Sequence, residues 1–256
     1  MKFELDKYYT PIEEAKRLID KTFEVIGKEN ISEVIEPSAG GGAFSLQIED
    51  CIAYDIEPEG ENIIKADFLE LDIEYKKDRL IIGNPPFGKQ TYKHFLNKAL
   101  KIADYVAFIM PVTLIGMTEY DGMKEAGLIL YEERLDDYLF NNKIRTIFIV
   151  VKRGKYKRSK PVKIDGIDIE RDKSKYAENN IYICAFGNST GRITTELYYA
   201  RNIIIHIDNQ QLREFIIKNW NREEYLKLFP CCSTPGATVY KISKYVKILY
   251  ERWKEV

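Results

Sequence analysis

Short apolar runs separated by polar turns and helical segments make up the N-terminal part of the chain. The runs cover residues 34–35, 51–54, 80–82, 105–110 and 144–151. Runs of this length, bounded by turn residues, predict buried strands. Apolar residues recur at helical spacing in residues 12–26 and 92–103, which predicts a helix in each. Strands that alternate with helices are typical of an α/β domain with a mostly parallel sheet.

The pattern changes after about residue 153. Residues 162–169 contain an Asp165-Gly166 turn between apolar residues, which predicts a hairpin. Further strands are expected at 181–186, 193–198 and 203–207, and helices at 210–218 and 239–253. These elements describe a small α+β region, so the predicted domains are residues 1–153 and 154–256. Residues 128–139 and 144–151 are expected to pair as strands at an edge of the first sheet.

Three local predictions concern the ends of these elements. Thr10, Pro11 and Glu13 form a capping-box pattern, so Thr10 is expected to cap the helix that runs to Gly27. The glycine-rich turn after residue 36 is expected to lead into a helix of about two turns that starts near Ala43. The glycines within residues 114–127 favour a loop over the site.

Composition narrows the class of protein. Of the 256 residues, 45% are hydrophobic and 31% are charged, which is ordinary for a globular protein. No apolar run reaches about 18 residues, and the N-terminus lacks the apolar core of a signal peptide, so a cytoplasmic protein without a membrane span is expected. The four cysteines (Cys51, Cys184, Cys231, Cys232) and two histidines lack the spacing of a metal site, so no metal cofactor is expected.

A basic strip interrupts the otherwise balanced charge. The net charge is −1, yet residues 152–160 contain six basic residues and no acidic one. The basic residues are Lys152, Arg153, Lys155, Lys157, Arg158 and Lys160. Such a strip at a domain junction predicts contacts with the phosphates of a nucleic acid. A solvated linker is the alternative.

The most distinctive tetrapeptide, Asn84-Pro85-Pro86-Phe87, directly follows the apolar run 80–82. Open α/β sheets place their ligands just beyond the carboxyl ends of such strands. The two prolines remove two backbone donors, and the Asn84 side-chain oxygen and the Pro85 carbonyl remain as acceptors. Two acceptors beside the Phe87 ring suit an amino group attached to a flat ring.

This tetrapeptide resembles the catalytic motif of the S-adenosylmethionine-dependent amino methyltransferases, especially the DNA adenine-N6 group. The resemblance covers roughly residues 8 to 152. It implies a Rossmann-like methyltransferase fold, a mostly parallel seven-stranded sheet with helices on both faces, followed by a small α+β C-terminal recognition region. It also implies S-adenosyl-L-methionine as the cofactor and double-stranded DNA as the partner. The implied activity is methylation of N6 of a flipped-out adenine in DNA, as in restriction–modification or phage systems.

The family motifs occur in order along the chain and imply roles for individual residues. The residues implied to bind the cofactor are Tyr9, Thr10, Pro11, Glu36, Pro37, Ala39, Gly40, Gly42, Asp55, Ile56, Asp67, Phe68 and Asn84. Asp55 is the candidate for the ribose hydroxyls, with Glu57 as the alternative, and Glu36 is expected near the methionine amino group. The catalytic residues would be Asn84, Pro85, Pro86 and Phe87. The target base would stack on Phe87 and on Phe140, with Phe148 as the alternative to Phe140.

The motifs specify the reaction more closely than the substrate. Similar tetrapeptides occur in RNA adenine-N6 and in protein glutamine-N5 methyltransferases. Phenylalanine at position 87 argues against the glutamine enzymes, so an RNA enzyme is the main alternative. A catalytically inactive nucleic-acid-binding subunit is a further alternative. The sequence leaves the oligomeric state and the recognition sequence open.

Overall fold

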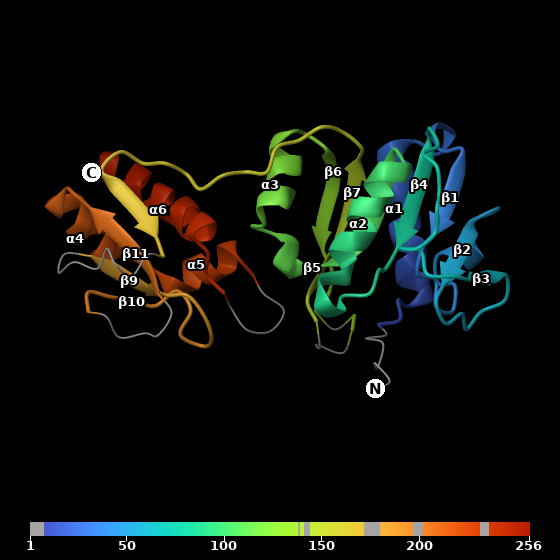
Figure 1. Ribbon diagram of the computed structural model, residues 1–256, viewed down its shortest axis with the longest axis horizontal. Coiled ribbons are helices and arrows are strands. Elements are labelled where there is room, and N and C mark those ends of the chain that lie inside the picture. Colours follow the sequence, from blue (N-terminus) through green and yellow to red (C-terminus); the bar gives the residue numbers. More distant parts are fainter. Residues whose placement is uncertain (1–7, 138, 141–143, 172–179, 197–201, 231–235) are drawn as a thin grey trace. The chain divides into compact units, whose positions relative to one another are not determined.

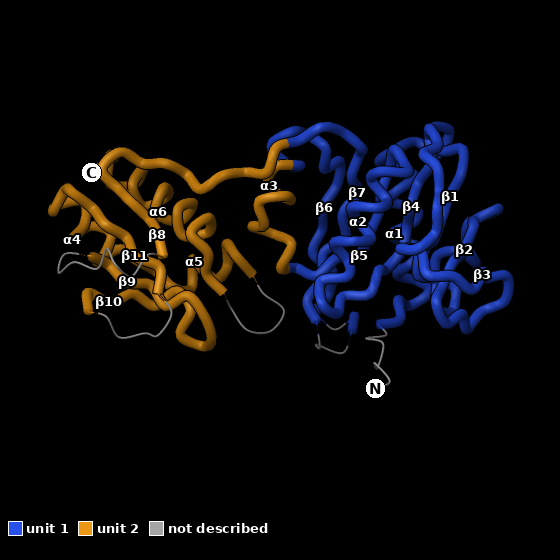
Figure 2. Tube along the Cα trace, viewed as in Figure 1, with its two compact units in different colours: residues 1–112, 123–156 blue, residues 113–122, 157–256 orange. Residues whose placement is uncertain are grey.

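The computed structural model describes residues 8–137, 139–140, 144–171, 180–196, 202–230 and 236–256 (Figure 1). The chain divides into two compact units (Figure 2). Unit 1 contains residues 1–112 and 123–156, and unit 2 contains residues 113–122 and 157–256. Unit 2 therefore includes a short segment, 113–122, that the predicted division into 1–153 and 154–256 assigns to the first domain.

Unit 1 is built on a seven-stranded sheet. Its strands are β1 (Glu33–Glu36), β2 (Ile52–Asp55), β3 (Ile63–Lys65), β4 (Arg79–Gly83), β5 (Tyr105–Pro111), β6 (Ile129–Arg134) and β7 (Thr146–Lys152). They lie in the order β3-β2-β1-β4-β5-β7-β6, and β7 runs antiparallel to both of its neighbours. This arrangement confirms the Rossmann-like methyltransferase fold expected from the sequence, including the paired strands at the sheet edge.

The core of unit 1 explains why these runs form strands. All five residues of β4 are buried, as are the first six of β7. Helix α1 (Ile12–Ile26) packs against β7 and α2 (Thr91–Ile102) against β5, each with its apolar stripe inward. Because β1, β2 and β4 are adjacent and parallel, their carboxyl ends meet at one edge.

Unit 2 has its own sheet and core. Strands β8 (Ile167–Glu170), β9 (Ile181–Cys184), β10 (Ile193–Thr194) and β11 (Asn202–Ile207) lie in the antiparallel order β10-β9-β11-β8. The helices are α4 (Gln210–Asn219), α5 (Arg222–Leu228) and α6 (Val239–Lys254). Helix α6 packs against β8 and α4, and α4 packs against β11. Alternate residues of β11 (Ile203, Ile205, Ile207) contribute to this core.

Several local predictions are wrong. The helix expected near Ala43 is a single 3₁₀ turn, η2 (Ser45–Gln47). The loop expected in 114–127 contains helix α3 (Thr118–Glu125), which begins in unit 2 and ends in unit 1. The predicted Asp165-Gly166 turn is present, because Ile164 and Ile167 form an antiparallel bridge across it, but the hairpin extends no further and β8 pairs with β11. Among the described residues, no helix is long and apolar enough to cross a membrane.

Candidate functional site

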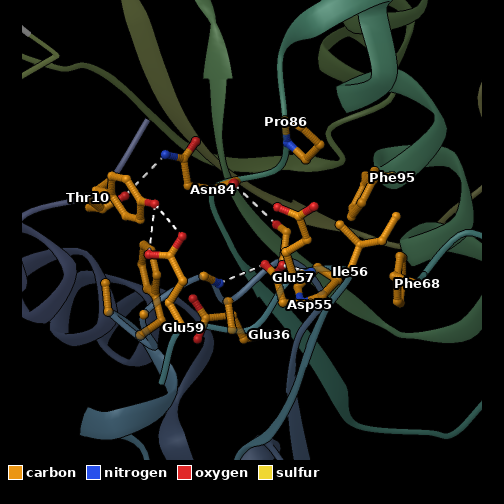
Figure 3. A pocket seen from close by; sticks show the side chains of 18 of the residues that line it. Thr10, Glu36, Asp55, Ile56, Glu57, Glu59, Phe68, Asn84, Pro86 and Phe95 are labelled. Carbon is orange, nitrogen blue, oxygen red and sulfur yellow. Dashed lines mark hydrogen bonds between the residues drawn. The ribbon is translucent and has the colours of Figure 1, made fainter. Parts of the chain in front are cut away.

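A cavity of about 360 Å³ opens at the carboxyl ends of β1, β2 and β4 in unit 1 (Figure 3). Sites for small molecules typically have a volume of about 300–1,000 Å³. Of the predicted site residues, twelve line it: Tyr9, Thr10, Glu36, Pro37, Ala39, Gly40, Asp55, Ile56, Asp67, Phe68, Asn84 and Pro86. They come from five separate segments of sequence, which the parallel strands bring together.

Of the residues predicted to bind the cofactor, to catalyse transfer or to stack on the base, five do not line this cavity: Pro11, Gly42, Pro85, Phe87 and Phe140. Pro11 is exposed at the start of α1, and Gly42 helps to form the glycine-rich turn behind the lining residues. The other three are buried. The lining also includes residues with no individual predicted role, among them Ser38, Phe44, Glu59 and Thr91. Tyr8 lines it too, and belongs to the segment Tyr8-Tyr9-Thr10-Pro11, which resembles the family motif over the methionine end of the cofactor.

The glycine-rich turn is held by Asp55 at the end of β2. The Gly40 N–H donates to Asp55 Oδ2 at 2.7 Å, and the Glu57 N–H donates to Asp55 Oδ1 at 2.7 Å. Gly40 has φ +54°, a left-handed conformation that favours glycine. The carboxylate therefore ties together two loops that line the same cavity, and each of its oxygens retains a second lone pair.

Glu36 is almost fully buried at the end of β1, with 2% of its surface exposed. Burial raises the pKa of its carboxyl group to about 7, and the nearby Asp55 charge also raises it. Hydrogen bonds from Ser45, whose N–H lies 2.8 Å from Oε2, and from Phe44 lower it. Near neutral pH this group is therefore poised between its protonated and ionised forms.

The raised pKa of Glu36 predicts a pH-dependent stability. As pH rises from about 4.5 to 7, the unfolded chain releases this proton while the folded protein keeps it. The contribution of Glu36 to stability should therefore fall over this range, by up to about 3 kcal/mol. Glu36→Gln keeps the shape and lacks the titration. Urea unfolding of both proteins at several pH values should show the wild type losing stability relative to the variant; parallel curves would contradict the prediction.

One end of the cavity is lined by aromatic and apolar side chains. The rings of Phe68 and Phe95 stack with centroids 5.4 Å apart, and Ile56 lies close by (Figure 3). Lys98 donates to the Leu69 carbonyl at 3.1 Å and lies 5.1 Å from the Phe68 ring centroid. Asp67 Oδ1 accepts from the Leu69 N–H at 2.9 Å. These contacts hold the segment after β3 at the apolar end of the cavity.

Asn84 follows β4 and turns its amide nitrogen toward the N-terminal segment (Figure 3). Nδ2 donates to the Tyr8 carbonyl at 2.8 Å and to Thr10 Oγ1 at 3.2 Å. A carbonyl only accepts, so this contact fixes which end of the amide is nitrogen. Oδ1 is then left buried with no partner among the described residues. Leaving a buried acceptor unsatisfied costs about 1–3 kcal/mol, so a hydrogen-bond donor from a ligand would be favoured at this oxygen.

The prediction that Thr10 caps α1 is wrong, because Thr10 bonds to Asn84 instead. The helix begins at Ile12 after Pro11, and Thr10 makes no capping hydrogen bond. Its hydroxyl instead accepts from Asn84, 74 residues away in sequence. The capping-box pattern therefore correctly located the start of the helix but assigned the wrong partner to Thr10.

Tyr9 bridges two sides of the cavity. Its hydroxyl lies 2.7 Å and 2.8 Å from the two carboxylate oxygens of Glu59 and donates to that carboxylate. Glu59 itself is held beside the glycine-rich turn, because its N–H donates to the Gly40 carbonyl at 2.9 Å. The N-terminal segment is thereby joined to the loop after β2.

The backbone is strained at two positions shortly after Phe87. Lys89 and Gln90 have φ values of 50° and 64°, in the left-handed region, although neither is glycine. This conformation costs roughly 1–2 kcal/mol per residue. Such strain tends to occur at functional sites, and here it lies next to the tetrapeptide.

Phe87 and Phe140, the predicted stacking residues, lie close together. Their ring centroids are 6.4 Å apart with an interplanar angle of 78°. Tyr8 contacts both rings. Phe148, the alternative to Phe140, is fully buried in β7, where it pairs with Ile109 of β5. The structure therefore places Phe140, and not Phe148, beside Phe87.

The basic strip is exposed to solvent along its length. Its residues, Lys152, Arg153, Lys155, Lys157, Arg158 and Lys160, all have exposed side chains. In unit 1, the Arg153 guanidinium stacks over the Tyr75 ring at 4.3 Å. In unit 2, Arg158 pairs with Glu119 at 3.1 Å. Two of the six charges thus have structural contacts.

No group of three or more His, Cys, Asp or Glu side chains able to hold a metal ion occurs in the described part of the chain. Cys51 and Cys184 are free thiols, and burial raises the pKa of Cys51 to about 12. Cys231 and Cys232 lie outside the described residues.

Comparison with known proteins gives structural matches only. No protein-family model and no curated protein matches the chain. Protein 1320 of Thermoplasma acidophilum is 20% identical, with a TM-score of 0.42 over 59% of this chain and 92% of its own. The 23S rRNA methyltransferase ErmE is 15% identical, with a TM-score of 0.43 over 58% and 70%.

A third match is the tRNA m1G37 methyltransferase of M. jannaschii. It is 20% identical, with a TM-score of 0.39, and the match covers 59% of this chain and 52% of that protein. This chain therefore spans about half the length of that enzyme. All three likenesses are remote, so the fold assignment rests on the strand order and the function on the cavity.

Proposed function

We propose that this protein transfers a methyl group from S-adenosyl-L-methionine to the N6 amino group of a flipped-out adenine in DNA. The observation that carries the proposal is the buried, unpartnered Oδ1 of Asn84, held at the wall of the cavity by the two hydrogen bonds that its own Nδ2 makes. An acceptor fixed in this way, at the carboxyl end of a central strand, is suited to an amino group that enters from outside.

The residues that line the cavity fit the proposed cofactor. Asp55 offers carboxylate lone pairs for ribose hydroxyls, and Phe68, Phe95 and Ile56 offer apolar surfaces for an adenine ring. Glu36 would balance the positive charge of the methionine amino group once it ionises. When bound, S-adenosyl-L-methionine supplies an electrophilic methyl group on a sulfonium sulfur.

The proposed role of Asn84 is to make the amino nitrogen nucleophilic. The lone pair of adenine N6 is delocalised into its ring, so the free base reacts poorly. Oδ1 of Asn84, with the Pro85 carbonyl as the second acceptor, would draw on the two N–H bonds and favour a tetrahedral nitrogen. Phe87 and Phe140 would hold the ring by stacking. Positioning of this kind supplies much of the catalysis when two reactants are held together.

DNA as the substrate is supported by the basic strip and by unit 2. A base must leave the helix to reach a cavity of this kind, and its lost stacking must be replaced. Unit 2 adds a separate sheet and core, and the exposed basic strip includes the point where the chain passes from unit 1 to residues 157–256 of unit 2. We propose that the strip contacts phosphates and that unit 2 reads the target sequence.

Transfer of labelled methyl from S-adenosylmethionine to mixed-sequence duplex DNA, total RNA and a protein extract tests the proposal directly. The expected product is N6-methyladenine in DNA, identified after digestion to nucleosides. Label in RNA alone would overturn the substrate and keep the chemistry. Label in protein alone, or no label despite tight cofactor binding, would contradict the proposed function.

A further inference from the structure

Three aromatic rings meet beside Asn84. Tyr8 stacks on Phe87 with centroids 5.5 Å apart and an interplanar angle of 28°. It meets Phe140 edge-on, with centroids 5.7 Å apart at 70°. Only 7% of Phe87 and 4% of Phe140 is exposed. One face of the Phe87 ring is therefore already covered by a flat ring of this chain.

The backbone carbonyl of Tyr8 and its ring contact different residues. Its carbonyl accepts from Asn84 Nδ2 at 2.8 Å, and this bond sets the orientation of the amide. Tyr8 is only partly buried, whereas both phenylalanines are buried. Rotation about the Cα–Cβ bond would carry the ring toward solvent and leave the carbonyl in place.

We propose that the Tyr8 ring occupies the place of the target base in the base-free protein and swings out when the base enters. The inference rests on the proposed function, since it concerns the same aromatic slot. The Tyr8 ring is nearly parallel to Phe87 at stacking distance and edge-on to Phe140, and its own carbonyl contacts Asn84. A base with an amino group directed at Asn84 would occupy the same place. Tyr8 would also shield the Phe87 ring from water until the base binds.

Binding of 2-aminopurine deoxyriboside tests this assignment without knowledge of the target sequence. Stacking quenches the fluorescence of this adenine analogue, so a titration reports entry into the slot. Tyr8→Ala removes the ring and keeps the carbonyl, and should bind the nucleoside about tenfold more tightly than the wild type, given the usual strength of aromatic pairs. Tyr8→Phe keeps the ring and should bind like the wild type.

Unchanged or weaker binding by Tyr8→Ala would overturn the inference, because a ring that is a permanent wall of the slot would help the probe to bind. Adding Phe87→Ala to Tyr8→Ala should remove the gain, which locates the probe. If Tyr8→Ala unfolds, Tyr8→Leu keeps an apolar residue and removes the stacking ring. The titration needs no methyl transfer, so tighter binding by a protein that methylates nothing would sink the proposed function alone.

Discussion

Replacing Asn84 by alanine is expected to reduce methyl transfer by at least 100- to 1,000-fold, the effect of removing one preorganised polar group from the reacting atom of other enzymes. The variant loses the buried Oδ1 and also the hydrogen bonds from Nδ2 to the Tyr8 carbonyl and the Thr10 hydroxyl. Cofactor affinity should change little, because the side chain lies at one edge of a cavity that 23 other residues also line. Single-turnover transfer and calorimetric cofactor titration measure the two effects separately.

Thr10→Val is the matched control for Asn84→Ala. It removes one of the two partners of Nδ2 and leaves Oδ1 and the Tyr8 carbonyl in place. Its transfer rate should fall far less than that of Asn84→Ala. Normal turnover by Asn84→Ala would remove the basis of the proposed function. Equal losses of transfer rate in both variants would show that the hydrogen bonds between Asn84 Nδ2 and the N-terminal segment, rather than Oδ1, support methyl transfer.

The sheet of unit 1 was predictable because its central strands contain apolar runs that end in turn residues. Residues 80–82 and 105–110 have no polar position at which a strand could be confused with a surface helix. The short helices were missed for a physical reason. Helix α5 has only seven residues and is started by Asn221, whose side chain accepts from two backbone N–H groups. Seven residues are too few for a helical period to stand out.

The cavity was predicted from the order of its motifs, but its cross-connections were not. Tyr8 and Asn84 are 76 residues apart in sequence and meet only because the N-terminal segment passes the end of β4. The helix expected near Ala43 gave way to a 3₁₀ turn in which the Ser45 N–H bonds to the buried Glu36. A single sequence shows which residues have suitable chemistry, whereas such contacts depend on the folded chain.

The second large effect is expected at Asp55, where Asp55→Ala should weaken cofactor binding by roughly 100-fold or more. Hydrogen bonds to a charged group contribute about 1.5–3 kcal/mol each, and the proposed ribose contact would be lost together with two backbone bonds. Those bonds hold Gly40 and Glu57 at 2.7 Å each, so the glycine-rich turn should also loosen. Cofactor titration should show the loss, and thermal unfolding should show how much comes from the turn.

Glu57→Ala distinguishes Asp55, at the end of β2, from Glu57, two residues further on, because the Glu57 side chain has no part in the backbone bond to Asp55. That bond uses the Glu57 N–H, which alanine retains. If Asp55 binds the ribose, Glu57→Ala should keep cofactor affinity within a few fold of the wild type, while Asp55→Ala loses it. The reverse result would move the ribose contact to Glu57, which lines the same cavity, and would leave Asp55 with the structural role of joining the two loops.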